Sequence, residues 1–137
     1  MKQDRGFTII ELIVVIAIIA ILAAIVLSNV SQFEGKGRDA AIKEQVEQIS
    51  TVATDYFSTS STGYAGMCGA GTKCGQIESN ISNLGGTFNA PNIKSDGSAY
   101  CMDFTLNDGV SKWCIDNTGY SGAQDSCSAT LLHYTCQ

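Results

Sequence analysis

The sequence contains few of the residue types on which catalytic and metal centres depend. Its 137 residues include a single histidine, His133, and a single proline, Pro91. No phosphate-binding glycine motif follows a predicted strand, and no group of residues suggests a nucleophile with its base. We therefore expect a non-enzymatic protein without a cofactor, and we assign His133 a structural role on a strand.

Basic residues are also scarce. Eight Lys and Arg residues stand against 13 acidic ones, which gives a net charge of −5 and a pI near 4.6. Lys36, Arg38 and Lys43 alternate with acidic residues, as on a solvated helix face. Proteins that bind nucleic acid normally carry a basic patch. The composition thus argues against strong direct binding of nucleic acid.

The residues that are abundant divide the chain into three parts. Residues 7–27 are almost wholly apolar, residues 28–58 are mixed, and residues 59–137 are rich in Gly, Ser, Thr and Asn. All six cysteines lie in the last part. An even number of clustered cysteines beyond an apolar segment indicates disulfides in an oxidising compartment. Zinc is the alternative, but no Cys-x-x-Cys occurs, so we expect no metal.

The apolar part is long enough to cross a membrane. From Phe7 to Leu27 the only polar residues are Thr8 and Glu11. A helix of this length spans about 30 Å, the thickness of a bilayer's hydrocarbon core. One alternative is a secretory signal peptide, although no strict Ala-x-Ala ends the run and Val26-Leu27-Ser28 is a weak substitute. A second is a plain single-span anchor with a basic N-terminal flank on the cytoplasmic side.

Glu11 distinguishes these alternatives. An acidic residue inside a membrane span is costly and is usually paired. A plain anchor leaves Glu11 unexplained, unless it lies close enough to the interface to stay hydrated.

The run from Gly6 to Leu12, Gly-Phe-Thr-Ile-Ile-Glu-Leu, resembles the class III leader and mature start of type IV pilins and their pseudopilin relatives. The resemblance is strong over residues 1 to about 30 and less specific to about 60. It implies that prepilin peptidase cuts between Gly6 and Phe7 and that Phe7 is then N-methylated. It also implies that Glu11 meets the terminal amino group of a neighbouring subunit during assembly. A buried charge pair costs less than two unpaired charges, so this pair would set axial register.

The sequence departs from the family at one position. Many filament-forming relatives have a proline near the twenty-second mature residue, where this chain has Ser28. The nearest helix-weakening residues are Gly35 and Gly37, each costing about 1 kcal/mol relative to Ala. If the helix loosens on assembly, we expect this between Ser28 and Gly37; the alternative is a straight helix that tolerates both glycines.

Apolar residues then continue at spacings of three and four. This pattern predicts an amphipathic helix that reaches about Phe57, and the run Ser58–Gly63 ends it. A coiled coil is disfavoured because the periodic stretch covers only about two heptads. Residues 59–97 read as an irregular connection with a local disulfide staple and a short helix over residues 76–84.

The clearest strand pattern covers residues 99–116 and turns at Asn107-Asp108-Gly109. We expect a register with Cys101 opposite Cys114, because it also places Asp103 opposite Lys112 and pairs the apolar residues. The remaining positions in this region receive simpler assignments: Trp113 in the core, residues 129–135 as a third strand, and Asp108, Asp116-Asn117 and Asp125 as solvated turn residues rather than calcium ligands.

This register predicts a Cys101–Cys114 disulfide. Pairing the other cysteines in order adds Cys68–Cys74 and Cys127–Cys136, one of three ways left open. The last of these loops resembles the disulfide-bounded region of many major pilins.

Together these expectations describe an α+β fold, with a long N-terminal helix packed on a small antiparallel sheet. Its parts would be a leader (1–6), a membrane and filament-core helix (7–27), an amphipathic stem (28–58) and an extracytoplasmic head (59–137). The resemblance implies a pilin that is inserted in the inner membrane as a precursor and then polymerises with identical subunits into a surface filament, using prepilin peptidase and the pilus assembly machinery. The alternatives are a pseudopilin of a type II secretion or competence filament, and a membrane-tethered binding domain.

Overall fold

The computed structural model describes residues 7–124, 126–130 and 133–136. The elements follow the chain in the order α1 (Ile9–Thr59), α2 (Lys73–Asn83), β1 (Thr87–Phe88), β2 (Asn92–Ile93), β3 (Tyr100–Thr105), β4 (Lys112–Asp116), β5 (Ser121–Gly122), β6 (Cys127–Thr130) and β7 (His133–Cys136). The chain forms two compact units, one ending at Glu34 and the other beginning at Gly35. From here on, the head means this second unit, which includes the end of the predicted stem as well as the part predicted to be the head (59–137). The long helix, small antiparallel sheet and disulfides confirm the α+β fold.

The helix α1 belongs to both units and runs without interruption. It includes Gly35 and Gly37, and the loosening expected between Ser28 and Gly37 on assembly stays a prediction. Its last residue, Thr59, lies close to the end predicted near Phe57. The Ser- and Thr-rich run that follows supplies hydroxyls that bond backbone carbonyls, as Ser58 does with Asp55 at 2.8 Å, which favours a helix end.

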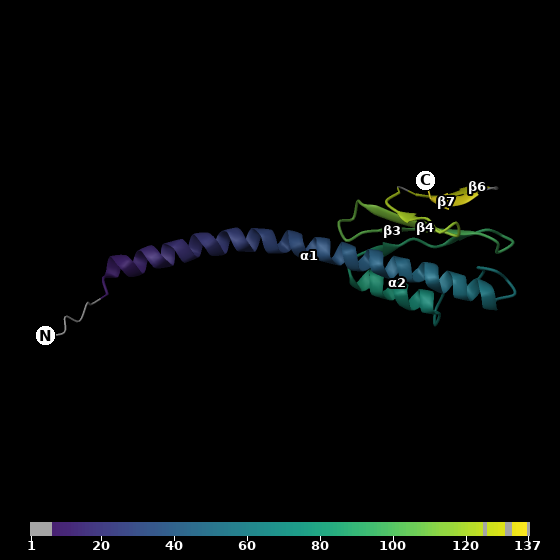
Figure 1. Ribbon diagram of the computed structural model, residues 1–137, viewed down its shortest axis with the longest axis horizontal. Coiled ribbons are helices and arrows are strands. Elements are labelled where there is room, and N and C mark those ends of the chain that lie inside the picture. The colour runs from purple at the N-terminus through teal and green to yellow at the C-terminus, as the bar shows by residue number, and fades with distance from the viewer. Residues whose placement is uncertain (1–6, 125, 131–132, 137) are drawn as a thin grey trace. The chain divides into compact units, whose positions relative to one another are not determined.

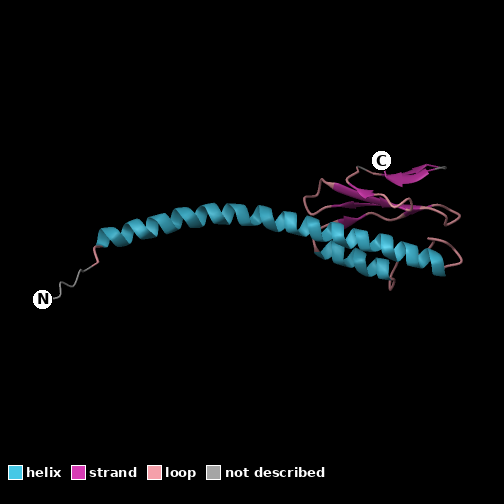
Figure 2. Ribbon diagram, in the orientation of Figure 1, coloured by secondary structure: helices cyan, strands magenta, loops and turns pink. Residues whose placement is uncertain are grey.

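The core of the head lies between α1, α2 and the sheet. Ile42, Val46, Ile49 and Ala53 of α1 are buried at the spacings of three and four that predicted an amphipathic helix. They pack with Ile77 and Ile81 of α2 and with Met102, Phe104 and Ile115 of the sheet. Figures 1 and 2 show the head part of α1 and the helix α2 side by side on one side of β3 and β4. Burial of this apolar face, rather than intrinsic propensity, supplies most of the stability of such a helix.

The connection after α1 is stapled and capped locally. A disulfide joins Cys68 to Cys74, the pair suggested by sequence order. The hydroxyl of Thr72 accepts a hydrogen bond from Gly75 N at 3.0 Å and so caps α2. This cap explains why α2 begins at Lys73, earlier than the predicted start at residue 76.

Two short strands in this connection were not predicted. β1 and β2 each pair antiparallel with β3, at opposite ends of that strand. Strands of two residues carry no readable alternation, so their pairing depends on the neighbouring strand rather than on their own sequence.

The register between β3 and β4 differs from the prediction by two residues. Cys101 lies opposite Asp116, and Asp103 lies opposite Cys114. The reason is the turn: Leu106 N donates to Ser111 O at 2.8 Å, so residues 107–110 form the loop instead of a tip at Asn107-Asp108. A shift of two keeps every side chain on its original face, and the hydrophobic pattern therefore does not separate the two registers.

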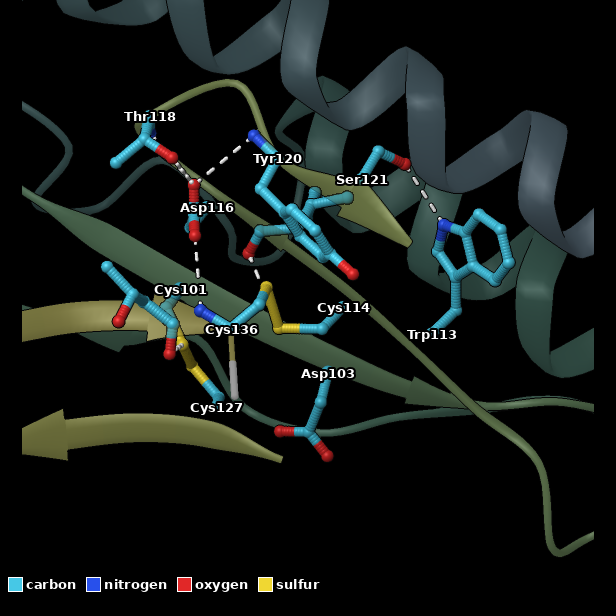
Figure 3. Close-up of a disulfide and its surroundings, with 12 residues drawn as sticks. Cys101, Asp103, Trp113, Cys114, Asp116, Thr118, Tyr120, Ser121, Cys127 and Cys136 are labelled. Atoms are coloured by element: carbon cyan, nitrogen blue, oxygen red, sulfur yellow. Dashed lines mark hydrogen bonds between the residues drawn. A yellow bond between two sulfur atoms is a disulfide. The ribbon is translucent and has the colours of Figure 1, made fainter. Parts of the chain in front are cut away.

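The predicted disulfides Cys101–Cys114 and Cys127–Cys136 are wrong. The structure joins Cys101 to Cys127 and Cys114 to Cys136, with Cα separations of 5.6 and 5.7 Å. In this register Cys101 and Cys114 lie diagonally on one face of the sheet, whereas Cys127 lies directly opposite Cys136 in the β6–β7 pair. Each disulfide thus joins the β6–β7 pair to the β3–β4 sheet, as the close-up in Figure 3 shows for the first.

The expected third strand over residues 129–135 is also wrong. β6 and β7 form their own two-stranded sheet, and β5 is the strand that pairs with β4. Figure 1 shows β6 and β7 on the side of the β3–β4 sheet away from α1. His133 begins β7, so its backbone lies in a strand as expected.

Trp113 lies at the margin of the core. It is half-buried and packs against the core cluster, while its Nε1 donates to Ser121 Oγ at 3.0 Å (Figure 3). The ammonium nitrogen of Lys43 lies 4.6 Å from the centre of the indole ring, which is the geometry of a cation–π contact. Trp113 thereby joins β4 to both β5 and α1.

Candidate assembly site

The first turn of α1 is held by a reciprocal pair of side chains. Thr8 Oγ1 accepts a hydrogen bond from Glu11 N at 3.3 Å, and Glu11 Oε2 accepts one from Thr8 N at 2.9 Å. The Thr8 hydroxyl also donates to Glu11 Oε2 at 2.6 Å. This is a capping box, in which a Thr before the helix and a Glu three residues later satisfy each other's backbone N–H groups.

The family resemblance implies a partner for Glu11 on another subunit, and no role was predicted for Thr8. The Thr-x-x-Glu spacing before an apolar run is a readable capping-box signal. The structure therefore adds an intramolecular function: Glu11 starts the helix of its own chain. The Glu11 carboxylate accepts two hydrogen bonds from Thr8, and these lower the free-energy cost of placing it in an apolar helix.

Beyond this cap, α1 exposes apolar side chains on every side. The large hydrophobic residues from Phe7 to Leu27 are 47–78 % exposed. This stretch is long and apolar enough to cross a membrane, and none of it is buried within the structure. A helix that is apolar all round is stable only when lipid or protein covers it. The two environments consistent with this segment are therefore a bilayer and a bundle of such helices.

The predicted processing site lies at the start of this unit. Gly6 lies outside the described residues. Phe7 is 78 % exposed and immediately precedes the capping residue Thr8. A new terminus at Phe7 would leave the capping box complete, because both of its residues follow the proposed cut.

Comparison with known proteins finds a family match over the N-terminal segment, residues 1–27. The prokaryotic N-terminal methylation motif family matches residues 1–27. The type IV major pilin protein PilA of Myxococcus xanthus (strain DK1622) is 39% identical over 56 residues, which are 41% of this chain and 26% of that protein. The chain thus carries a methylation motif at its N-terminus and is similar over 56 residues to a type IV major pilin. The chain spans about a quarter of the length of the curated relative that it matches. No solved structure matches the chain.

The acidic residues considered as calcium ligands take other roles where the structure describes them. Asp108 is exposed, and its carboxylate accepts hydrogen bonds within its own turn. Asp116 is only 3% exposed, so its predicted place among the solvated turn residues is wrong. Asp125 lies outside the described residues. Within the described ranges, no group of three or more His, Cys, Asp and Glu side chains is placed to hold a metal ion.

Proposed function

We propose that this protein is a pilin, the structural subunit of a type IV pilus-like surface filament. The observation that carries the proposal is the joining of a methylation-motif helix, exposed and apolar on all sides, to a head with its own core and three disulfides. The similarity to a major pilin favours this function over that of a pseudopilin.

The proposed sequence of events begins with a precursor in the inner membrane. Prepilin peptidase removes residues 1–6, and the new amino group of Phe7 is methylated. Residues 7–27 first span the bilayer and then pack with the same segment of identical subunits, so that protein replaces lipid around them. Residues 28–58 form the stem, and residues 59–137 remain extracytoplasmic, where disulfides persist.

Glu11 links processing to assembly in this scheme. Both of its hydrogen bonds from Thr8 reach Oε2. We assign the other oxygen, Oε1, to the amino group of Phe7 in a neighbouring subunit. Because the capping box orients the carboxylate before assembly, less conformational entropy is lost when the two charges meet.

The first test is the mass of the mature N-terminus in the native cells. We expect a chain that begins with N-methylated Phe7. An intact Met1, or a cut beyond residue 20, would contradict the proposed processing.

The second test compares Glu11→Ala with Glu11→Gln, scoring filaments by electron microscopy and the yield of sheared filament protein. We expect both variants to be inserted in the membrane and processed, yet to lose filaments, because neither can form the charge pair. The membrane fraction of each variant is the control. Filaments at wild-type yield from both variants would remove Glu11 from assembly.

A further inference from the structure

Two complementary features lie at opposite ends of the head. The first is the β3–β4 loop, residues 107–110, which is anchored to α1 where Asn107 N donates to Asp39 Oδ1 at 2.9 Å. The second is a groove of about 270 Å³ beside the last turns of α1. With a rise of about 1.5 Å per residue, Asp39 and Tyr56 lie roughly 25 Å apart along the helix. Figure 2 shows the two ends of the head part of α1, with the sheet extending between them.

The loop displays an apolar side chain on a fixed backbone. Val110 is 81% exposed, more than any other large hydrophobic residue described in the head. Asp108 Oδ1 accepts hydrogen bonds from Val110 N at 2.9 Å and from Ser111 N at 2.7 Å. Gly109 takes the positive φ of 72° that the turn needs. A loop already held in one conformation loses little entropy when it docks.

The groove has an apolar floor and a charged rim. Met67 is 1% exposed, and the partly buried side chains of Val52 and Tyr56 lie beside it. Asp55 and Lys73 line the same groove and are exposed. The ion pair found among the described residues is Lys94–Asp96, so neither rim charge has an ionic partner there.

The loop and the first residue of β4 together carry a matching set of residues. Val110 stands between an acid, Asp108, and a base, Lys112. The hydrogen bond from the Ser111 hydroxyl, together with those from the backbone, lowers the pKa of Asp108, which keeps its carboxylate charged at neutral pH. The loop region therefore offers an exposed apolar side chain with one charge of each sign beside it in the sequence, and the groove offers an apolar floor with one charge of each sign on its rim. Charge complementarity of this kind gives an interface its specificity.

We propose that the β3–β4 loop of one subunit docks in the groove of a second copy of this chain. Val110 enters between Val52, Tyr56 and Met67. Asp108 lies toward Lys73, and Lys112 lies toward Asp55. The proposal rests on the pilin function and adds a head-to-head contact to the contacts of the apolar helices.

The placement of the two surfaces determines the kind of assembly. They differ from each other and lie at opposite ends of the head, so the contact is heterologous. A heterologous contact whose rotation does not close generates an open helical filament. Each added subunit would present a new free loop at one end and a new free groove at the other.

The direct test places a photo-crosslinking amino acid at position 110 of the full chain and irradiates intact filaments. We expect covalent dimers in which position 110 is joined to residues 52–73 of the second copy. The matched control carries the same amino acid at Asn83, an exposed position on α2. Crosslinks from position 110 that map elsewhere, or filaments that give no dimer, would overturn the docking proposal.

A charge exchange tests the orientation of the loop. Asp55→Lys and Lys112→Asp should each lower the yield of sheared filaments by about tenfold, equivalent to ~1.4 kcal/mol at the interface. The double variant should recover most of that yield, because the pair is restored in reverse. Asp108 is left unchanged so that the turn stays intact. A double variant that assembles no better than either single variant contradicts the assigned pair.

Val110→Asp separates this proposal from the pilin function. We expect it to keep all three disulfides, which peptide mapping verifies, and to lose most filaments. If Val110→Asp assembles normally while Glu11→Ala does not, the docking proposal fails and the pilin function stands. If the wild-type chain is neither processed nor assembled, the pilin function fails, and the docking proposal fails with it.

Discussion

Asp116 is a buried carboxylate whose hydrogen bonds hold three segments together. Its Oδ1 accepts from Thr118 N, Thr118 Oγ1 and Tyr120 N, and its Oδ2 accepts from Cys136 N at 3.1 Å. Figure 3 shows the carboxylate between the turn after β4 and the backbone of Cys136. One residue therefore fixes the β4–β5 turn and attaches β7 to it. Burial of this charge is tolerated because both oxygens have donors.

Replacing Asp116 by Asn tests this role. The amide retains one oxygen acceptor but places an NH₂ group against a backbone donor, either at Cys136 or in the turn. We expect the free energy of unfolding to fall by about 1–3 kcal/mol, measured by denaturant titration in detergent. Asp55→Asn is the matched control, because Asp55 is exposed. Equal stability of the two variants would mean that the Asp116 network contributes nothing.

Tyr100 gives the head a defined response to alkaline pH. Its side chain is 2% exposed, and burial raises the pKa of its phenol to about 12, above the ordinary value of 10.0. The unfolded chain thus loses this proton first as the pH rises. We expect stability to be unaffected by this group below pH 10 and to fall between pH 10 and about 12. Burial also raises the pKa of Tyr64, so ultraviolet absorbance should show a late-titrating component that decreases in Tyr100→Phe without disappearing. Early titration of every tyrosine would contradict the prediction.

At the scale of elements, the turn after α1 lies directly against the β2–β3 loop, and Gly63 of the turn contacts Gly97 of the loop. Tyr64 N donates to Gly97 O at 2.9 Å, which ties the turn after α1 to the β2–β3 loop. A Cβ on Gly63 would lie 2.2 Å from Gly97 O, and Gly63 has a positive φ of 62°. A side chain at position 63 therefore requires the two loops to move apart.

Gly63→Ala should therefore destabilise the head by more than backbone strain alone. The control is Gly71→Ala, which also has a positive φ but nothing within 4 Å of the added Cβ. Strain alone costs roughly 1–2 kcal/mol, and we expect Gly63→Ala to exceed the control by at least ~1 kcal/mol in thermal unfolding. Equal losses in the two variants would show that the loops separate at little cost.

The two disulfides Cys101–Cys127 and Cys114–Cys136 join the β6–β7 pair covalently to the β3–β4 sheet. Peptide mapping without reduction should recover Cys101 with Cys127 and Cys114 with Cys136. The double variant Cys114→Ser/Cys136→Ser should lower the free energy of unfolding by about 2–4 kcal/mol. Its control is Cys68→Ser/Cys74→Ser, whose short loop constrains the unfolded chain less and should cost less. Recovery of a Cys101–Cys114 peptide would contradict the register of the sheet.

At the scale of the whole molecule, the two units depend on different surroundings. Every residue of the core cluster lies at or beyond Ile42, within the head, whereas the first unit exposes its apolar side chains. A unit with its own core can fold by itself.

A fragment of residues 35–137 should accordingly fold without detergent. We expect one cooperative unfolding transition, a helical circular dichroism spectrum and three intact disulfides, while the full chain requires detergent to remain soluble. Aggregation of the oxidised fragment, or scrambled disulfides, would show that the first unit is needed for the head to fold.

The sequence by itself determined the features that depend on neighbours along the chain. The apolar run with Glu11 and the buried face that begins at Ile42 each follow from spacing within one segment, whereas Cys68–Cys74 belonged to one of three pairings that the sequence left open. Residue patterns of this kind are local, so a single sequence is sufficient to recognise them. The capping role of Thr8 belongs with them, since its signal lies within four residues.

Only the tertiary structure decided how distant segments combine. The register between β3 and β4 depended on the hydrogen bonds of the β3–β4 loop, because a shift of two residues preserves the hydrophobic pattern. The pairing of Cys101 with Cys127 and of Cys114 with Cys136 followed from that register and from the position of β6–β7 over the sheet. Asp116 became a buried anchor for the same reason, since its donor from Cys136 lies 20 residues away in the chain.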